Sequence, residues 1–242
     1  MGDTPRRPQI VAMGGGGFST DPENLLLERY ILSLVCKERP KILFLATASG
    51  DAQDYVGRFY EAFESLPCSP SHLSLFNPST ADLESVILSQ DVVYVGGGNT
   101  KSMLALWREW GLVGVLHEAW RRGIVLAGVS AGSICWFEQG ITDSIPGAFT
   151  ALDCLGFLQG SNCPHFDSEP NRQPTYRLLI GAGGIRDGYA TDDGVALHFK
   201  DDSLYGIIAA RPNGKAYRLE ANQGTVRETT LDPVSLADYL TI

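Results

Sequence analysis

The sequence lacks a long hydrophobic run, and this absence excludes one class of protein. Its apolar stretches, such as residues 92–95 and 124–127, are far shorter than the roughly 20 residues that a helix needs to cross a bilayer. The residues before the first apolar stretch carry charges but no hydrophobic signal segment. We therefore expect a cytoplasmic protein with no membrane partner.

Basic clusters and paired cysteine motifs are also absent. The 19 Lys and Arg residues are outnumbered by 28 Asp and Glu, the net charge is −9, and no basic cluster exceeds a pair. Such a chain offers no electrostatic surface for nucleic acid. The five cysteines are widely spaced without a C-x-x-C, and no H-x-x-x-H or carboxylate–histidine cluster occurs. We therefore expect no disulfide framework, no metal and no cofactor.

What is present is the composition of an ordinary globular protein, with 44% hydrophobic and 10% aromatic residues over a length of 242. We expect one domain over residues 1–242. Its first part alternates apolar strands with helices, which is typical of a parallel sheet covered on both faces. The expected strands are 10–13, 41–46, 72–76, 91–95 and 124–127, and the expected helices include 54–65, 101–107 and 113–121.

The texture of the sequence changes beyond residue 185. Short strands with alternating polarity are expected at 195–200, 205–210 and 216–220, separated by turn residues. This pattern predicts either an antiparallel extension of the main sheet or a small β-meander beside it.

Glycine-rich turns follow three expected strands, after Met13, Val95 and Ala127. Ligands bind at this carboxyl edge in open doubly wound sheets. The turn at 96–100 lacks the Lys-Ser/Thr of a P-loop, and the run at 14–17 does not fit G-x-G-x-x-G, so neither favours a nucleotide. The turn at 96–100 would instead expose backbone N–H groups to a phosphate or an oxyanion.

The third turn, Gly128 to Gly132, has the pattern G-x-S-x-G between an expected strand and helix. This pattern is typical of a nucleophile elbow, in which glycines permit a sharp turn that exposes the central serine. Ser130 is then the nucleophile, with the N–H of Ala131 as an anion stabiliser. Ser133 lies one turn into the helix. A small-residue turn that merely allows close packing would show the same pattern.

A serine nucleophile needs a base, and the sequence has four histidines. His165 is the best candidate because it lies in a polar loop rich in proline and glycine, where catalytic side chains are often placed. His72, His117 and His198 lie in expected strands or on a helix, which favours structural or surface roles. The orienting acid stays open among Asp143, Asp167, Asp192 and Asp193, since spacing does not choose between them.

Four segments together resemble the peptidase E family, the S51-type serine dipeptidases that also include cyanophycinase-related enzymes. These segments are YVGGGNT, GVSAGSICWFEQGITDSIPG, LGFLQGSNCPHFDSE and GYATDDGVALHF, and they span most of residues 92–200. The resemblance implies an α/β fold of the class I glutamine-amidotransferase-like type. That fold is a three-layer, flavodoxin-like sandwich with a mostly parallel sheet, here with a C-terminal antiparallel extension.

The resemblance also implies roles for individual residues. Ser130 would be the nucleophile and His165 the general base. The N–H group of Gly97 or Gly98, together with that of Ala131, would form the oxyanion hole.

The resemblance implies Asp193 as the acid, with Asp143 as the alternate. Known members prefer an N-terminal aspartate in the substrate, which requires a cation. Arg172 is the first candidate for that cation and Arg211 the second. Asn99 and Arg172 are the substrate-binding residues that we expect.

These features predict a serine peptidase for short peptides, of dipeptidase or aminopeptidase type and with Asp-X among the expected substrates, that acts through a Ser-His-Asp acyl-enzyme. One alternative is a non-catalytic member of the fold that binds a small ligand. Another is a cysteine-dependent hydrolase, which would need Cys135 at the elbow. The expected partner is a small peptide, and a homodimer is an option.

Overall fold

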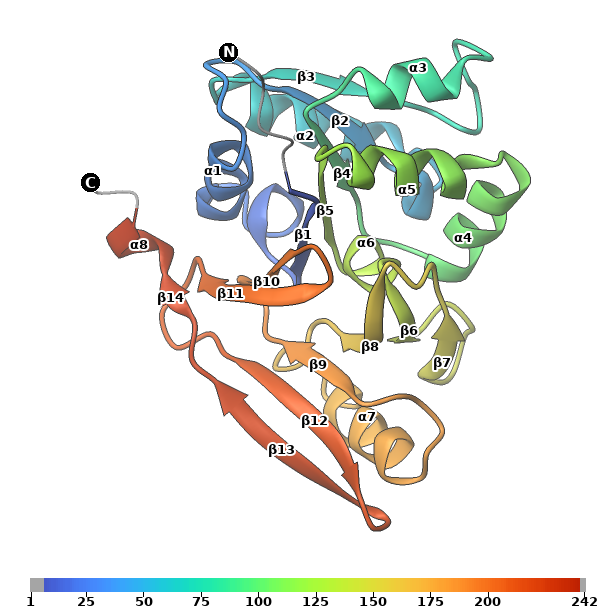
Figure 1. Cartoon of the computed structure of the whole chain (residues 1–242), viewed down its shortest axis with the longest axis vertical. Coiled ribbons are helices and arrows are strands. Elements are labelled where there is room, and N and C mark those ends of the chain that lie inside the picture. The colour runs from blue at the N-terminus through green and yellow to red at the C-terminus, as the bar shows by residue number, and fades with distance from the viewer. Residues whose placement is uncertain (1–6, 240–242) are drawn as a thin grey trace.

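The computed structural model describes residues 7–239, so both ends of the domain expected over residues 1–242 lie outside the described residues. Two sheets organise the chain, one of eight strands and one of six (Figure 1). The eight-stranded sheet occupies the upper part of the view, and the six-stranded sheet lies below it with the long β12–β13 hairpin.

The eight-stranded sheet has the order β14-β11-β10-β1-β5-β4-β2-β3. Its central strands β1, β5, β4 and β2 are parallel, as is the edge strand β3. Strand β10 is antiparallel to both of its neighbours, β1 and β11, and the edge strand β14 is parallel to β11. The strands are β1 (Gln9–Met13), β2 (Lys41–Leu45), β3 (Ser69–His72), β4 (Val92–Val95), β5 (Val125–Val129), β10 (Val195–Lys200), β11 (Ser203–Ala209) and β14 (Val234–Ser235).

Helices cover both faces of this sheet, because successive strand residues point to opposite sides. In β1, Val11 and Met13 pack into the cluster that contains α1, α2 and α8, whereas Ile10 and Ala12 pack into the cluster that contains α3, α4 and α5. The helices are α1 (Leu26–Ser33), α2 (Gln53–Glu64), α3 (Leu83–Leu88), α4 (Thr100–Glu109), α5 (Leu112–Arg121) and α8 (Leu236–Tyr239). The predicted α/β fold with a mostly parallel sheet is confirmed.

The six-stranded sheet, ordered β13-β12-β9-β8-β6-β7, follows the first in the chain. Its strands are β6 (Phe137–Thr142), β7 (Thr150–Asp153), β8 (Leu158–Cys163), β9 (Gly188–Thr191), β12 (Ala216–Asn222) and β13 (Thr225–Leu231). Helix α7 (Arg172–Gly181) packs on it through Tyr176 and Ile180. The sequence predicted either an antiparallel extension of the main sheet or a small β-meander beside it. Strands β10 and β11 extend the first sheet, whereas β12 joins the second, so each prediction holds in part.

One predicted strand was placed wrongly. Residues 72–76 were expected to form a strand, but β3 spans Ser69–His72 and ends there. One carboxylate oxygen of Asp51 accepts hydrogen bonds from the hydroxyl of Ser74 and the N–H groups of Leu75 and Phe76, at 2.7, 2.9 and 3.2 Å. These N–H groups point to Asp51 rather than to a neighbouring strand, and the ladder stops.

None of the helices in residues 7–239 combines the length and hydrophobicity required to span a membrane.

Candidate active site

Ser130 lies where β5 ends and the short helix α6 (Ala131–Ile134) begins, in a strained backbone conformation. Its φ is 58° and its ψ is −113°, a conformation that costs a non-glycine residue about 1–3 kcal/mol. A Cβ on Gly128 would lie 2.2 Å from the carbonyl oxygen of Gly132, and a Cβ on Gly132 would lie 2.2 Å from that of Val95. Both glycines are therefore required for the turn, which has the geometry expected of a nucleophile elbow.

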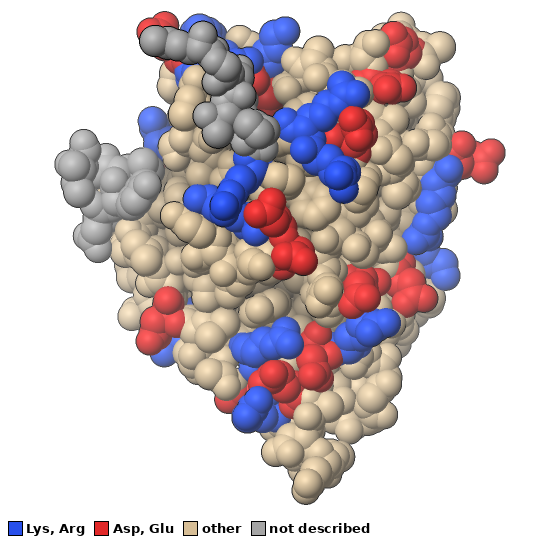
Figure 2. Space-filling view, viewed as in Figure 1, with Lys and Arg blue, Asp and Glu red and all other residues tan. Residues whose placement is uncertain are grey.

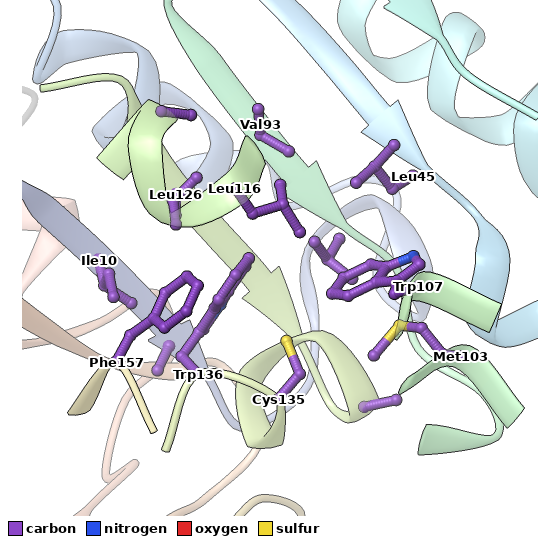
Figure 3. Packing of buried hydrophobic residues seen from close by; sticks show 14 of the residues in the cluster. Ile10, Leu45, Val93, Met103, Trp107, Leu116, Leu126, Cys135, Trp136 and Phe157 are labelled. Atoms are coloured by element: carbon purple, nitrogen blue, oxygen red, sulfur yellow. The ribbon is translucent and has the colours of Figure 1, made fainter. Parts of the chain in front are cut away.

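The other nucleophilic side chains of this segment are buried behind the elbow. Ser133 is fully buried, and its hydroxyl accepts a 2.6 Å hydrogen bond from the amide of Asn162. Cys135 lies in the hydrophobic cluster with Trp107 and Trp136 (Figure 3), and burial raises the pKa of its thiol well above the usual value. A thiol in this position is not a competent nucleophile, which argues against the cysteine-dependent alternative.

The second sheet supplies the histidine. Strands β8 and β9 are parallel neighbours, so the turns that follow them lie side by side. His165 is in the turn after β8 and Asp193 in the turn after β9, and the N–H of Phe166 donates to the carbonyl of Thr191 across the two turns at 3.1 Å. The distance from His165 Nδ1 to Asp193 Oδ1 is 2.7 Å, with 17% and 27% of the two side chains exposed.

The electrostatics of this pair favour an ionised Asp193. Burial acts to raise the pKa of Asp193, but the hydrogen bond from His165, with contributions from Ser168 and the charge of Arg211, brings it below its ordinary value. In the tautomer that carries its proton on Nδ1, His165 donates to the carboxylate of Asp193, and Nε2 carries the lone pair.

The three other acids that we considered have different positions. Asp192 is buried and accepts the N–H of Lys215 at 2.9 Å; burial, with the charge of Asp167 nearby, raises its pKa to about 6. Asp167 accepts the N–H of Asp193 at 2.9 Å. Asp143 is exposed and lines a surface groove of about 520 Å³. Only Asp193 contacts His165 directly, and its role as the acid stays a prediction.

The glycine run at 14–17, which the sequence placed at the ligand-binding edge of the sheet without a role of its own, lies against the His165–Asp193 pair. A Cβ on Gly15 would lie 2.0 Å from Asp193 Oδ1 and 2.8 Å from His165 Nδ1. The carbonyl of Gly15 accepts the N–H of Gly194 at 2.9 Å, and the carbonyl of Met13 accepts the N–H of Ser130 at 3.2 Å. The turn after β1 therefore joins the elbow to the histidine–acid pair.

The turn after β4 lies against Ser130. A Cβ on Gly97 would lie 3.2 Å from the Cβ of Ser130. The N–H of Gly97 donates to the hydroxyl of Tyr55 at 3.2 Å. Within residues 7–239, the N–H groups of Gly98 and Ala131 donate to no protein acceptor. Of the three predicted oxyanion donors, the N–H groups of Gly98 and Ala131 therefore have no acceptor among these residues, whereas the N–H of Gly97 already donates to Tyr55.

The two expected substrate-binding side chains have partners within the protein. The amide of Asn99 accepts the N–H of Ser102 at 2.9 Å, which caps α4, and donates to the carbonyl of Ser144 at 3.0 Å. Arg172 is buried and ion-paired with Glu169 at 2.7 Å. These contacts argue against the substrate-binding roles that we expected for Asn99 and Arg172. Both roles stay predictions.

No group of three or more His, Cys, Asp or Glu side chains in residues 7–239 is arranged to hold a metal ion. On the face shown in Figure 2, acidic and basic residues are interspersed among the described residues. They form no continuous basic area on that face.

Comparison with known proteins identifies the family. The model of peptidase family S51 matches residues 10–207. The chain belongs to peptidase family S51. As a member of S51 it is a serine-type peptidase, and the resemblance to peptidase E seen in the sequence is confirmed.

A curated relative and two solved structures are similar to this chain. The uncharacterized peptidase YgaJ of Bacillus subtilis is 55% identical over 223 residues, which cover 92% of this chain and 96% of YgaJ. A peptidase structure from an acI-B1 actinobacterium has a TM-score of 0.70 at 16% identity, covering 95% of this chain and 96% of its own. A candidate peptidase E from Listeria monocytogenes has a TM-score of 0.62 at 17% identity, covering 93% and 100%. These two structures share the fold of this chain.

Proposed function

We propose that this serine-type peptidase hydrolyses short peptides through an acyl-enzyme on Ser130, with His165 as the base and Asp193 as the acid. The observation that carries the proposal is the 2.7 Å contact between His165 and Asp193. This pair lies against the turn after β1, and the last residue of β1 accepts a hydrogen bond from the N–H of Ser130 at the elbow. The three residues come from three separate turns, and each lies at the carboxyl end of a strand.

The chemistry follows from these positions. Nε2 of His165 removes the proton of Ser130 as its oxygen attacks the peptide carbonyl, and Asp193 stabilises the imidazolium that forms. The N–H groups of Gly98 and Ala131 hydrogen-bond the tetrahedral oxyanion. His165 then protonates the leaving amine, and water hydrolyses the ester on Ser130 with His165 again as the base.

One contact of this mechanism must form with the substrate. The hydroxyl of Ser130 makes no hydrogen bond with His165 or with any other residue in the described part of the chain. Catalytic hydrogen bonds often tighten only when a substrate is bound. We therefore assign the proton transfer from Ser130 to the substrate complex.

Specificity for an N-terminal aspartate would require an available cation. Arg172 is paired with Glu169, and Arg211 is paired with Asp167. Neither arginine is free to bind a substrate carboxylate without losing its partner. We propose a dipeptidase or aminopeptidase without strong preference for Asp-X.

A fluorophosphonate probe tests the nucleophile. We expect one-to-one labelling of the wild type, loss of labelling in Ser130→Ala, and retention in the matched control Ser133→Ala. Absence of labelling in folded wild-type protein would instead support the alternative, a member of the fold that binds a small ligand without catalysis.

A dipeptide panel tests the substrate. We expect turnover of Ala-X and Gly-X within about tenfold of that of Asp-X. Without a free cation to pair with it, the side-chain carboxylate of an Asp-X substrate has no large binding advantage over an uncharged side chain. Turnover of Asp-X alone would overturn the proposed specificity.

A further inference from the structure

We propose that Asp167 and Arg211 form a positioning pair that holds Asp193 in the place from which it hydrogen-bonds His165. The consequence for catalysis rests on the proposed function, whereas the positioning itself is measurable without turnover.

Asp167 contacts the backbone of Asp193. Oδ1 of Asp167 accepts the N–H of Asp193 at 2.9 Å. Asp167 lies two residues after His165, so the loop that carries the base also holds the main chain of the acid. A hydrogen bond from a backbone N–H to a carboxylate is charge-assisted and directional, and it limits movement of the two turns relative to one another.

Arg211 contacts the other carboxylate oxygen of Asp167. The guanidinium of Arg211 forms an ion pair with Oδ2. Both oxygens of Asp167 therefore have a partner, one from the turn of the acid and one from the segment after β11. An ionised carboxylate with two fixed partners has little freedom to rotate.

Arg211 is itself fixed against the turn that carries Asp193. The carbonyl of Gly194 accepts the N–H of Ala210 at 2.8 Å. A Cβ on Gly194 would lie 3.0 Å from Cγ of Arg211, so the aliphatic part of the arginine lies on the backbone next to Asp193. A continuous series of contacts thus runs from Arg211 through Asp167 and Asp193 to His165.

Because Asp167 and Arg211 are partly exposed, an effect on the position of Asp193 can be distinguished from an effect on stability. The side chain of Arg211 is 39% exposed and that of Asp167 is 30% exposed. Ion pairs at such a surface contribute little to the free energy of unfolding. A displacement of a catalytic group by about 1 Å, in contrast, can lower turnover about 100-fold. Loss of the pair should therefore change catalysis far more than it changes the melting temperature.

Kinetics form the first arm of the test. We expect Asp167→Ala and Arg211→Gln to lower kcat by about 10- to 100-fold, with KM for Ala-X within about twofold of the wild type. Asp167→Asn should lose less, because its amide oxygen still accepts the N–H of Asp193. In an Asp193→Ala background, Asp167→Ala should change kcat by less than about twofold, since residues that act through one another are not additive.

Nuclear magnetic resonance of ¹⁵N-histidine-labelled protein forms the second arm. The Nδ1 proton of His165, assigned by its loss in His165→Ala, should be protected from exchange in the wild type and broadened in Asp167→Ala and Arg211→Gln. The control is Arg227→Gln, which removes the exposed ion pair with Glu220 on the β12–β13 hairpin. That variant should match the wild type in both arms.

Three results would overturn the proposal. One is an unchanged His165 Nδ1 resonance in both variants, and another is an equal effect of Asp167→Ala with and without Asp193. The third is a selective loss of Asp-X turnover in Arg211→Gln with Ala-X unchanged, which would assign Arg211 to substrate binding instead. If the wild type shows no turnover at all, the proposed function fails while the resonance still decides whether the pair positions Asp193.

Discussion

At the scale of single residues, the four acidic side chains considered as the partner of His165 have four different environments. Asp193 contacts His165, Asp167 holds the backbone of Asp193, Asp192 is buried beside Lys215, and Asp143 faces solvent. Nothing in their sequence spacing distinguishes them. Their roles depend on which turn each side chain faces once the second sheet has formed.

The choice between the two predicted acids can be measured directly. We expect Asp193→Asn to lower kcat/KM by about 10³–10⁴-fold, because an amide cannot accept the Nδ1 proton in the same way and leaves His165 in the wrong tautomer. Asp143→Asn should stay within about threefold of the wild type. Steady-state kinetics on one good dipeptide would show this, and equal small losses in both variants would remove Asp193 from the triad.

A second prediction at this scale concerns Gly15. Gly15→Ala places a methyl group where the carboxylate of Asp193 lies. We therefore expect kcat to fall about 100-fold because Asp193 and His165 are displaced. Gly57→Ala is the matched control, because Gly57 lies in α2 and a Cβ there has no atom within 4 Å. It should leave kcat unchanged and raise the free energy of unfolding by about 0.5–1 kcal/mol. Equal activity in both variants would show that the close approach at Gly15 is not needed.

At the scale of elements, the elbow was predictable and the second sheet was not. In the strand–turn–helix of residues 125–134, a Cβ on Gly128 would meet Gly132 within the same motif, so this part of the turn depends on local sterics, whereas a Cβ on Gly132 would meet Val95 of the neighbouring strand β4. The strands β6, β8 and β9 contain polar residues and irregular register, as at Phe137 and Gln139. They have no continuous apolar pattern, so the sequence predicts no strand at these positions.

Helix α7 provides the prediction at this scale. Arg172, at its first position, also donates to the carbonyl of Ile141 at 3.2 Å and packs on the ring of Phe149 at 4.6 Å. We expect Arg172→Ala to lower the free energy of unfolding by about 1–3 kcal/mol, because a buried carbonyl and the partner carboxylate lose a charged donor. Urea unfolding would measure this change.

The same variant should leave substrate preference unchanged. The ratio of kcat/KM for Asp-X to that for Ala-X should match the wild type within about twofold. A selective loss of Asp-X turnover with unchanged stability would restore Arg172 as a substrate-binding residue.

At the scale of the whole molecule, one buried acid makes stability depend on pH. Glu28 is fully buried under the glycine run at 14–17, and Oε1 accepts the N–H of Phe18 at 2.9 Å. Burial raises the pKa of Glu28 from 4.5 to about 7, against the lowering effect of that hydrogen bond. The folded state therefore binds the proton more tightly than the unfolded state. Its contribution to stability is complete below pH 4.5 and is lost as the pH rises through 7.

We expect Glu28→Gln to remove this dependence. Between pH 5 and pH 8 the wild type should lose up to about 3 kcal/mol of unfolding free energy relative to the variant, which follows from the difference between the two pKa values. Urea unfolding at both pH values measures it, with the exposed neighbour Glu23→Gln as the control. A parallel change in wild type and variant would show that Glu28 does not ionise in this range.

The sequence by itself determined the features that depend on neighbours in the chain. These are the parallel strands with their glycine turns, the strained position of Ser130, and the polar loop that carries His165. Short-range sterics and hydrophobic periodicity fix such features within a few residues. For the same reason, the motifs sufficed to indicate the S51 family.

Only the tertiary structure decided which groups meet at the site. The pairing of β8 with β9 brings the turns of His165 and Asp193 together, and the turn at Gly15 packs against them from the first sheet. It also buries Arg172 and engages Gly97 with Tyr55. These contacts join segments far apart in the chain, so they depend on how strands, helices and turns pack together, which no local sequence pattern specifies.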